Sequence, residues 1–404
     1  MILFILFLDK FVSIVKEKCL PENMLGELHM LLHADDTVIF STSRKKFIKK
    51  CNVLLTAFHE NRLELNLSKS SFMIINPNDH NLNDLRTNIK LESGWLSYKK
   101  SVVYLGVIIS DTGKISDDLD SHVADRSKSV FVKLSNFIKN NNFAPVTIKL
   151  KILKSCLESS LLYGCETWGS SSLVKVETLY RKAIKIVLSM SNRTPTELVY
   201  VESGLIELKC LVYKRQYKFW KKVLSELERG EESTIDILYN QAISKNLQYL
   251  RHYQKLVQKF SNADECFQHY LEAFQKRTTD TISEKTTIER NSVLNDYVRI
   301  NASLTSPDFY HKYIIKEYDR LIITKYRSGS HFLKIQTGRS ENIEQIQRLC
   351  SCDDEVQTLE HVLFRCEILN GLRPNDIGFS LKDFFESPKA APFLRVVEKT
   401  LKLR

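Results

Sequence analysis

The sequence has little glycine and little proline, the residues that most often mark turns and linkers. Glycine (12) and proline (8) make up about 3% and about 2% of the 404 residues, below the usual ~7% and ~5%. This scarcity excludes collagen-like, linker-rich and low-complexity chains. Because leucine, lysine, glutamate and isoleucine recur throughout, we expect most of the chain to be helical and a large β-sandwich to be absent.

The chain also lacks a long apolar run. Its apolar opening, residues 1–8, is cut by Asp9 and Lys10, far short of the ~20 residues that span a bilayer. The opening has neither a basic leader nor a small-residue cleavage site, so we expect no membrane segment and a buried amphipathic helix over residues 1–20. Such a helix needs something upstream to pack against, and we therefore expect an N-terminal portion to be missing.

Acidic residues are in the minority. Lysine plus arginine (59) exceeds aspartate plus glutamate (48) by 11, which favours contact with polyanions such as nucleic acid. Nine cysteines are too few and too unevenly placed for a secreted disulfide framework. We expect an intracellular protein, nuclear or cytoplasmic, of two or three domains, and no protein partner is evident.

Two apolar runs, residues 28–32 and 37–40, flank His33, Ala34, Asp35 and Asp36. This pattern predicts a β-hairpin with acids at its tip, where the turn lets neighbouring carboxylates point the same way. One or two carboxylates plus substrate phosphates make a sufficient Mg²⁺ site, and paired ions catalyse in-line phosphoryl transfer. An isolated pair of aspartates is more often a simple turn feature, since aspartate bonds its local backbone.

After the hairpin, the pattern of apolar residues first predicts a helix and short strands, and then helices alone. Ser43 predicts the N-cap of a helix that runs to about Leu63. Short strands are expected at residues 72–76, 89–91 and 102–109. After Gly113 the apolar period is helical. Helices are expected there at residues 117–139, 146–163, 173–190, 195–203, 207–229, 235–260, 264–300 and 306–326.

Four segments resemble, in the family's own order, the reverse transcriptases of retrotransposons without long terminal repeats. The resemblance covers roughly residues 1–200. The four segments are His33-Ala34-Asp35-Asp36, Leu63-Glu64-Leu65-Asn66-Leu67-Ser68-Lys69-Ser70, Tyr104-Leu105-Gly106-Val107 and Leu161-Leu162-Tyr163-Gly164-Cys165-Glu166-Thr167-Trp168.

This resemblance implies an RNA-directed DNA polymerase with a palm and a helical thumb. Such an enzyme uses two Mg²⁺ ions, nucleoside triphosphates, an RNA template and a DNA primer. Asp35 would be the main Mg²⁺ ligand and Asp36 its less essential neighbour, while Lys69 would donate a proton or stabilise charge at the pyrophosphate leaving group. The primer end would be held by Tyr104, Leu105 and Gly106.

The sequence also departs from the family pattern. His33 stands where the family usually has tyrosine or phenylalanine. A third carboxylate on an earlier strand, and a Gly-rich element followed by Ser-Pro, are absent from the 32 residues before His33. A misplacement of ~1 Å can cost ~10²-fold in rate, so we expect a polymerase remnant that is inactive alone. The alternatives are a non-catalytic nucleic-acid-binding protein, a translated fragment without function, and a metal-dependent nuclease.

Basic residues gather on the expected helices beyond residue 140. They would contact the phosphate backbones of template and primer, each adding to a salt-dependent affinity; the alternative is a solvated charged face. Neighbouring aromatic residues such as Tyr213, Tyr217 and Trp220 are expected to pack inward. The candidate nucleic-acid-binding residues are Lys149, Lys154, Arg181, Lys182, Lys185, Lys214, Lys218 and Lys221.

A second group of candidate metal ligands lies near the C-terminus. Cys350, Cys352, His361 and Cys366 follow the spacing Cys-x-Cys-x8-His-x4-Cys. Three thiolates and one imidazole form a closed tetrahedral set for structural Zn²⁺, although the first interval is shorter than usual. Similar knuckles close many proteins of the family. The alternative is that His361 and Cys366 are packing residues on a helix over residues 358–369.

Together these observations predict an α+β protein. We expect a partial reverse transcriptase palm at residues 1–110, a helical thumb-like region at 111–230, a helical connector at 231–336 and a knuckle-like tail at 337–404.

Overall fold

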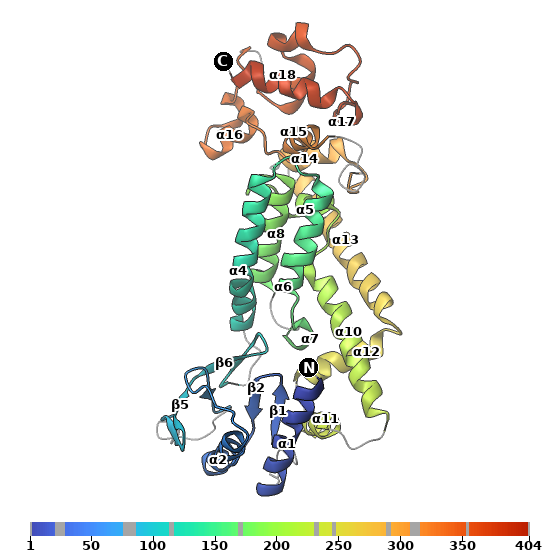
Figure 1. The fold of residues 1–404 in the computed structure, drawn as a ribbon. Coiled ribbons are helices and arrows are strands. Elements are labelled where there is room, and N and C mark those ends of the chain that lie inside the picture. The colour runs from blue at the N-terminus through green and yellow to red at the C-terminus, as the bar shows by residue number, and fades with distance from the viewer. Residues whose placement is uncertain are drawn as a thin grey trace. The chain divides into compact units, whose positions relative to one another are not determined.

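The computed structural model of the chain combines many helices with few strands (Figure 1), which confirms the α+β class. The chain folds as two compact units, which we describe separately. The first unit comprises Met1–His122, Glu166–Ser171 and Gln216–Ser261, and the second comprises the remaining residues. The structure describes residues 2–20, 29–75, 86–112, 117–168, 173–229, 234–244, 248–287, 292–307, 316–352 and 355–402.

The strands all lie in the first unit and form three small sheets. An antiparallel hairpin joins β1 to β2, a second joins β6 to β7, and the third sheet has the order β3-β5-β4 with β3 parallel to β5. The strands are β1 (Met30–His33), β2 (Asp36–Ile39), β3 (Ser71–Phe72), β4 (Ile89–Leu91), β5 (Gly94–Tyr98), β6 (Ser101–Tyr104) and β7 (Val107–Ser110).

The helices make up most of the rest of the chain. They are α1 (Ile2–Lys18), α2 (Arg44–Glu60), α4 (Asp117–Asn140), α5 (Val146–Ile152), α6 (Ser159–Leu161), α7 (Cys165–Trp168), α8 (Val174–Leu188), α9 (Thr196–Ser203), α10 (Leu208–Leu227), α11 (Thr234–Ser244), α12 (Gln248–Lys259), α13 (Ala263–Thr287), α14 (Ser292–Ile300), α15 (Glu317–Arg327), α16 (Lys334–Ser340), α17 (Leu381–Glu386) and α18 (Ala390–Lys402). π-helical turns cover Leu153–Glu158 and His361–Arg365, and 3-10 turns cover Gln345–Gln347 and Glu367–Leu372.

Several expected boundaries were wrong. The strand expected at 102–109 is a tight hairpin, the strand expected at 72–76 is only two residues long, and β5 was not expected. The helix expected at 146–163 is interrupted by a π-helical turn, and the ones expected at 235–260 and 264–300 are each two helices. Gly113, together with residues 21–28 and 308–315, lies outside the described residues.

In the first unit, α1 packs on α2 and both cover the β1–β2 hairpin. The rings of Phe11 and Phe58 meet edge to face at 5.0 Å in this core. Ser43 caps α2 as expected, since its side chain accepts a hydrogen bond from the backbone N–H of Lys46. Lys50 is buried and donates from Nζ to the carbonyl oxygen of Phe40 at 2.8 Å. Its ammonium thus joins α2 to the end of β2.

In the second unit, buried ion pairs join helices that are far apart in the sequence. The carboxylate of Glu317 accepts from Lys149 Nζ at 2.9 Å and from Arg320 Nη2 at 2.7 Å. Glu202 is fully buried and accepts from Arg327 Nε at 2.8 Å and from the hydroxyl of Tyr297 at 2.6 Å. A buried charge is tolerated only when it is paired and hydrogen-bonded, so these contacts fix α5, α9, α14 and α15 together.

The C-terminal part of the second unit has its own apolar core. Helix α15 packs against α18, and α17 packs against α14 and α18 (Figure 1). Phe384, Phe393 and Leu394 are among the fully buried side chains there. All nine cysteines are free thiols. Within the described ranges, no helix is both long enough and apolar enough to cross a membrane.

Candidate functional site

The acidic hairpin has the predicted form. His33 pairs with Asp36 across the β1–β2 ladder, and Ala34 and Asp35 form the two-residue turn. Ala34 has φ +51°, a left-handed conformation that costs a residue with a Cβ of order 1 kcal/mol or more. Backbone strain of this kind is concentrated at functional sites. The structure therefore places both carboxylates at the end of a strained two-residue loop.

Both aspartates of this hairpin are open to solvent. Asp35 and Asp36 are exposed side chains, as is His33. Neither carboxylate is within ion-pair distance of a cation among the residues that the structure describes. Two exposed carboxylates on consecutive residues of one hairpin, with no ion pair to a described residue, suit a hard divalent cation that keeps several waters.

The Tyr104 segment lies close to the acidic hairpin. Burial, followed by the negative charge of Asp36, raises the pKa of Tyr104 above its ordinary value. The turn that follows between β6 and β7 has both central residues in the left-handed region, Leu105 at φ +47° and Gly106 at φ +74°. A tight hairpin needs this backbone, but leucine adopts it only at a cost. The second motif turn is therefore strained as well.

The Lys69 segment forms a compact turn organised by Asn66. The Asn66 side-chain oxygen accepts from the hydroxyl of Ser68 at 2.7 Å and from the backbone N–H of Lys69 at 3.2 Å. The hydroxyl of Ser70 donates to the Asn66 carbonyl at 2.9 Å. The Lys69 side chain is exposed, and no hydrogen bond or ion pair within the described ranges joins it to Asp35. The structure thus gives Asn66 a role in shaping the turn, whereas it shows no structural role for the Lys69 side chain among the described residues.

The fourth motif segment is mainly structural. Leu161, Leu162 and Trp168 are buried, and Gly164 turns the chain at φ +71°. Tyr163 is 51% exposed, and Thr167 is exposed as well. This segment fixes the backbone and leaves one aromatic side chain on the surface.

The candidate basic residues have very different surroundings. Lys149 is fully buried against Glu317, and burial lowers its pKa, so it cannot reach a phosphate and its assignment as a nucleic-acid contact was wrong. Lys185 donates to the carbonyl oxygens of Asn192 and Thr194, both at 2.7 Å. Lys214 pairs with Asp264 at 2.7 Å. Among the other candidates Arg181 is half-buried, and the exposed ones are Lys154, Lys182, Lys218 and Lys221.

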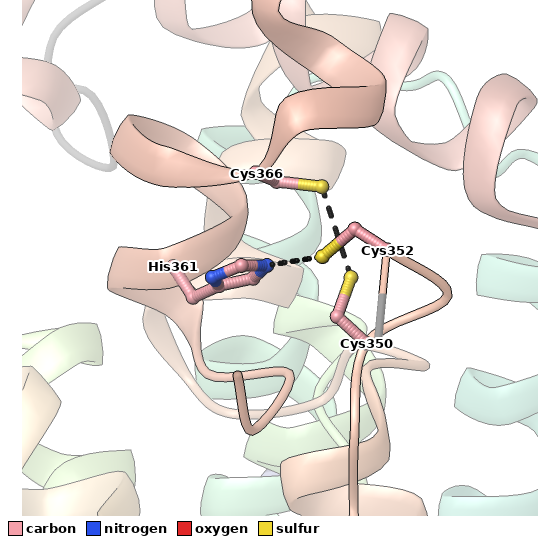
Figure 2. Close-up of side chains that lie close together, drawn as sticks. All are labelled: Cys350, Cys352, His361 and Cys366. Atoms are coloured by element: carbon pink, nitrogen blue, oxygen red, sulfur yellow. Dashed lines mark hydrogen bonds between the residues drawn. The ribbon is translucent and has the colours of Figure 1, made fainter. Parts of the chain in front are cut away.

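The cysteine and histidine side chains near the C-terminus converge on one point. Their donor atoms all lie within 4.8 Å of one another (Figure 2). The Sγ atoms of Cys350 and Cys366 are 3.7 Å apart, and Sγ of Cys352 is 3.2 Å from Nε2 of His361. A zinc tetrahedron with Zn–S bonds of ~2.3 Å has S···S edges of ~3.8 Å. The set therefore fits a metal of this kind.

Two residues that the sequence reading missed support this cluster. Oε2 of Glu355 lies 3.2 Å from Nδ1 of His361, and Gln357 Nε2 donates to Cys350 Sγ at 3.7 Å. Arg365 holds the Glu355 carboxylate in turn, at 3.0 Å. A carboxylate on the far nitrogen of a ligating histidine fixes its orientation and raises its basicity. Nothing in the residue spacing could have identified Glu355, because its role depends on the fold of the loop.

The helix expected at residues 358–369 is not a regular α-helix. His361 lies on a π-helical turn, Cys366 lies after its end, and a 3-10 turn follows. Burial and the neighbouring Cys350 thiol raise the pKa of Cys366 to about 12. Irregular helical turns often occur at functional sites, and this one brings His361 and Cys366 to the same point as the two cysteines of the preceding loop.

Comparison with protein families gives one match. Residues 1–109 match the family described as reverse transcriptase (RNA-dependent DNA polymerase). The match covers a little over a quarter of the chain and includes the first three motif segments, which supports a reverse transcriptase-like domain there. Searches among curated proteins and among solved structures give no significant match.

Proposed function

We propose that residues 1–110 are part of the palm of a reverse transcriptase of the type found in retrotransposons without long terminal repeats. The observation that carries this proposal is the strained hairpin that presents Asp35 and Asp36 next to the Tyr104 turn. The family match over residues 1–109 supports it independently of the geometry. The fourth segment, at 161–168, lies beyond that match and agrees with the same family.

Asp35 and Asp36 would hold Mg²⁺ in this palm, with Asp35 as the main ligand. Mg²⁺ bound there would bring nucleoside triphosphate phosphates to the site and offset the charge of phosphoryl transfer. The strained β6–β7 turn at Tyr104, Leu105 and Gly106 would hold the primer end. Lys69, exposed on its asparagine-centred turn, would supply positive charge near the leaving group.

These 404 residues by themselves are not expected to synthesise DNA. The hairpin is a two-stranded sheet in the part of the chain that the structure describes, and two exposed carboxylates alone bind Mg²⁺ loosely. A third carboxylate on a neighbouring strand would be needed to fix the ion within the tolerance that catalysis demands.

The helical region at residues 111–230 would act as a thumb on the template and primer. The exposed residues Lys154, Lys182, Lys218 and Lys221 are the candidates for phosphate contacts, and Arg181, next to Lys182 in the sequence of α8, is a further one. The buried Lys149 is left out. A helical connector at 231–336 and a tail at 337–404 would follow.

The tail would bind one structural Zn²⁺ through Cys350, Cys352, His361 and Cys366. Donor spacing, burial and the Glu355–His361 contact all support this. Bound zinc would tie the loop of the two cysteines to the π-helical turn. The proposal predicts one zinc per purified chain, and a metal-free chain with an unchanged fold would overturn it.

A second candidate function is non-catalytic binding of nucleic acid, favoured by the exposed lysines on α8 and α10. One experiment tests nucleic-acid binding, which both functions require, and the expected lack of DNA synthesis. Binding and extension of an RNA template with a DNA primer are measured in parallel with Mg²⁺, for the native chain and for Asp35→Asn. We expect binding by both and extension by neither. Mg²⁺-dependent extension that Asp35→Asn abolishes would contradict the inactivity, and loss of primer–template binding in the native chain would contradict both functions.

A further inference from the structure

A groove in the second unit, outside the residues of the proposed palm, has not been assigned a role. It has a volume of about 770 Å³ and lies between α15, α18, the loop after α4 and the end of α8. This size is within the range of ligand sites in proteins. The side chains that define its character are Phe143, Tyr318, Lys325, Arg395, Lys399 and Lys402.

Two helical faces form its walls. Tyr318 and Lys325 are seven residues apart on α15, and Arg395, Lys399 and Lys402 follow one another at intervals of four and three on α18. Residues at this spacing share one face of a helix. Because α15 and α18 pack together, the groove is lined along its length by both faces.

The groove carries a positive charge. Its lining has four cations and the single carboxylate of Glu398. Lys325 and Lys402 both contact Glu398, and Arg395 contacts Asp319 next to the groove. Lys399 is exposed and forms no ion pair with a described residue. One carboxylate shared by two ammonium groups leaves a net positive field that favours an anionic ligand.

Two aromatic rings at the groove are unusually open. Phe143 is 63% exposed and Tyr318 is 55% exposed. Their centroids are 6.0 Å apart with the rings tilted by 48°, and the guanidinium of Arg395 lies 4.2 Å from the Tyr318 centroid. Exposed aromatic rings beside cations are the arrangement that binds unpaired bases, because every base has a face that can stack.

We propose that this groove binds single-stranded nucleic acid, with bases stacked on Phe143 and Tyr318 and phosphates held by Lys399 and Lys402. A duplex offers its phosphates but keeps its base faces inside, so the groove should prefer single strands. RNA and DNA both offer the base faces and phosphates that the groove would contact. The inference rests on the groove alone and not on the polymerase proposal.

The test uses the whole chain and fluorescence anisotropy of labelled 12-nucleotide RNA and DNA strands and of a matched duplex. Removing two rings, Phe143→Ala with Tyr318→Ala, should weaken single-strand binding by ~5-fold or more, the low end of one base–aromatic stack. The control is Phe379→Ala, which removes an even more exposed ring elsewhere in the same unit.

A second pair of variants tests the phosphate contacts. Lys399→Gln with Lys402→Gln should reduce the slope of log affinity against log salt by ~1.4, since each lost contact to a single strand contributes ~0.7. Lys382→Gln, an exposed lysine on α17, should leave the slope unchanged. Thermal unfolding of every variant checks the fold.

The proposal predicts these losses for RNA, DNA or both, and smaller losses for the duplex. It is overturned if folded groove variants bind single strands with native affinity and salt slope, which would assign binding to the thumb lysines and leave the polymerase proposal standing. It is also overturned if the ring variants bind single strands with native affinity while an oligoglutamate peptide displaces those strands. The groove would then bind anions without stacking bases.

Discussion

The proposed zinc site makes a graded prediction. Removing the charge behind a ligating histidine, as in Glu355→Gln, weakens metal affinity ~10- to 100-fold in comparable sites. The contact at 3.2 Å between Oε2 of Glu355 and His361 Nδ1, with Arg365 bound to the same oxygen at 3.0 Å, places Glu355 in that role. Cys366→Ser removes one of four ligands outright, so it should weaken zinc binding further than Glu355→Gln.

The assay is competition for zinc between the purified chain and a chelating dye, with metal content measured separately. Glu367→Gln and Cys156→Ser are matched controls, since both residues are exposed and lie outside the cluster. We expect one zinc per native chain. The affinity for zinc should be highest for the native chain, lower for Glu355→Gln and lowest for Cys366→Ser. Equal affinity of Glu355→Gln and the native chain would refute the role of the carboxylate, and zinc held equally well by Cys366→Ser would refute the ligand set.

Three predictions concern the buried charges of the second unit. Arg327→Met leaves Glu202 buried without its cation and should lower the free energy of unfolding by about 3–5 kcal/mol, measured by urea denaturation; a loss under 1 kcal/mol would contradict the pairing. Burial raises the pKa of Glu177 from 4.5 to about 7, so the native state favours its protonated form. Stability should therefore fall by about 3 kcal/mol as pH rises from 4.5 to 7, and Glu177→Gln should remove that fall; an unchanged profile would contradict it. Lys149→Met should destabilise the fold by about 1–3 kcal/mol through its lost bond to Glu317, yet leave oligonucleotide affinity unchanged, and weaker binding by the folded variant would restore it as a phosphate contact.

Elements with a strong local signal could be predicted from the sequence. The β1–β2 hairpin follows from its apolar runs and turn residues, the cap of α2 from the chemistry of Ser43, and α8 from its helical apolar period. The interruption of the helix expected at residues 146–163 could not be predicted, because it depends on tertiary packing. The π-helical turn at Leu153–Glu158 interrupts a sequence with an unbroken helical period.

The candidate sites show the same division. Cys350, Cys352, His361 and Cys366 could be grouped from their spacing, and the structure brings them together. Lys149 could not be told apart from the exposed lysines, because its partner Glu317 is 168 residues away in the chain. Contacts between residues this far apart in the chain cannot be predicted from local sequence patterns.

The proposed palm depends most on divalent metal binding at the acidic hairpin. Fe²⁺ in place of Mg²⁺ reduces added hydrogen peroxide to hydroxide and a hydroxyl radical, and ascorbate returns the resulting Fe³⁺ to Fe²⁺. The radicals cut the backbone near the bound ion, and the fragments can be mapped by mass spectrometry. We predict cuts at the β1–β2 turn and at the turn after Tyr104, lost in Asp35→Asn and competed by Mg²⁺. Cuts elsewhere, or cuts at the hairpin that persist in the doubly substituted Asp35→Asn, Asp36→Asn chain, would contradict the proposed palm.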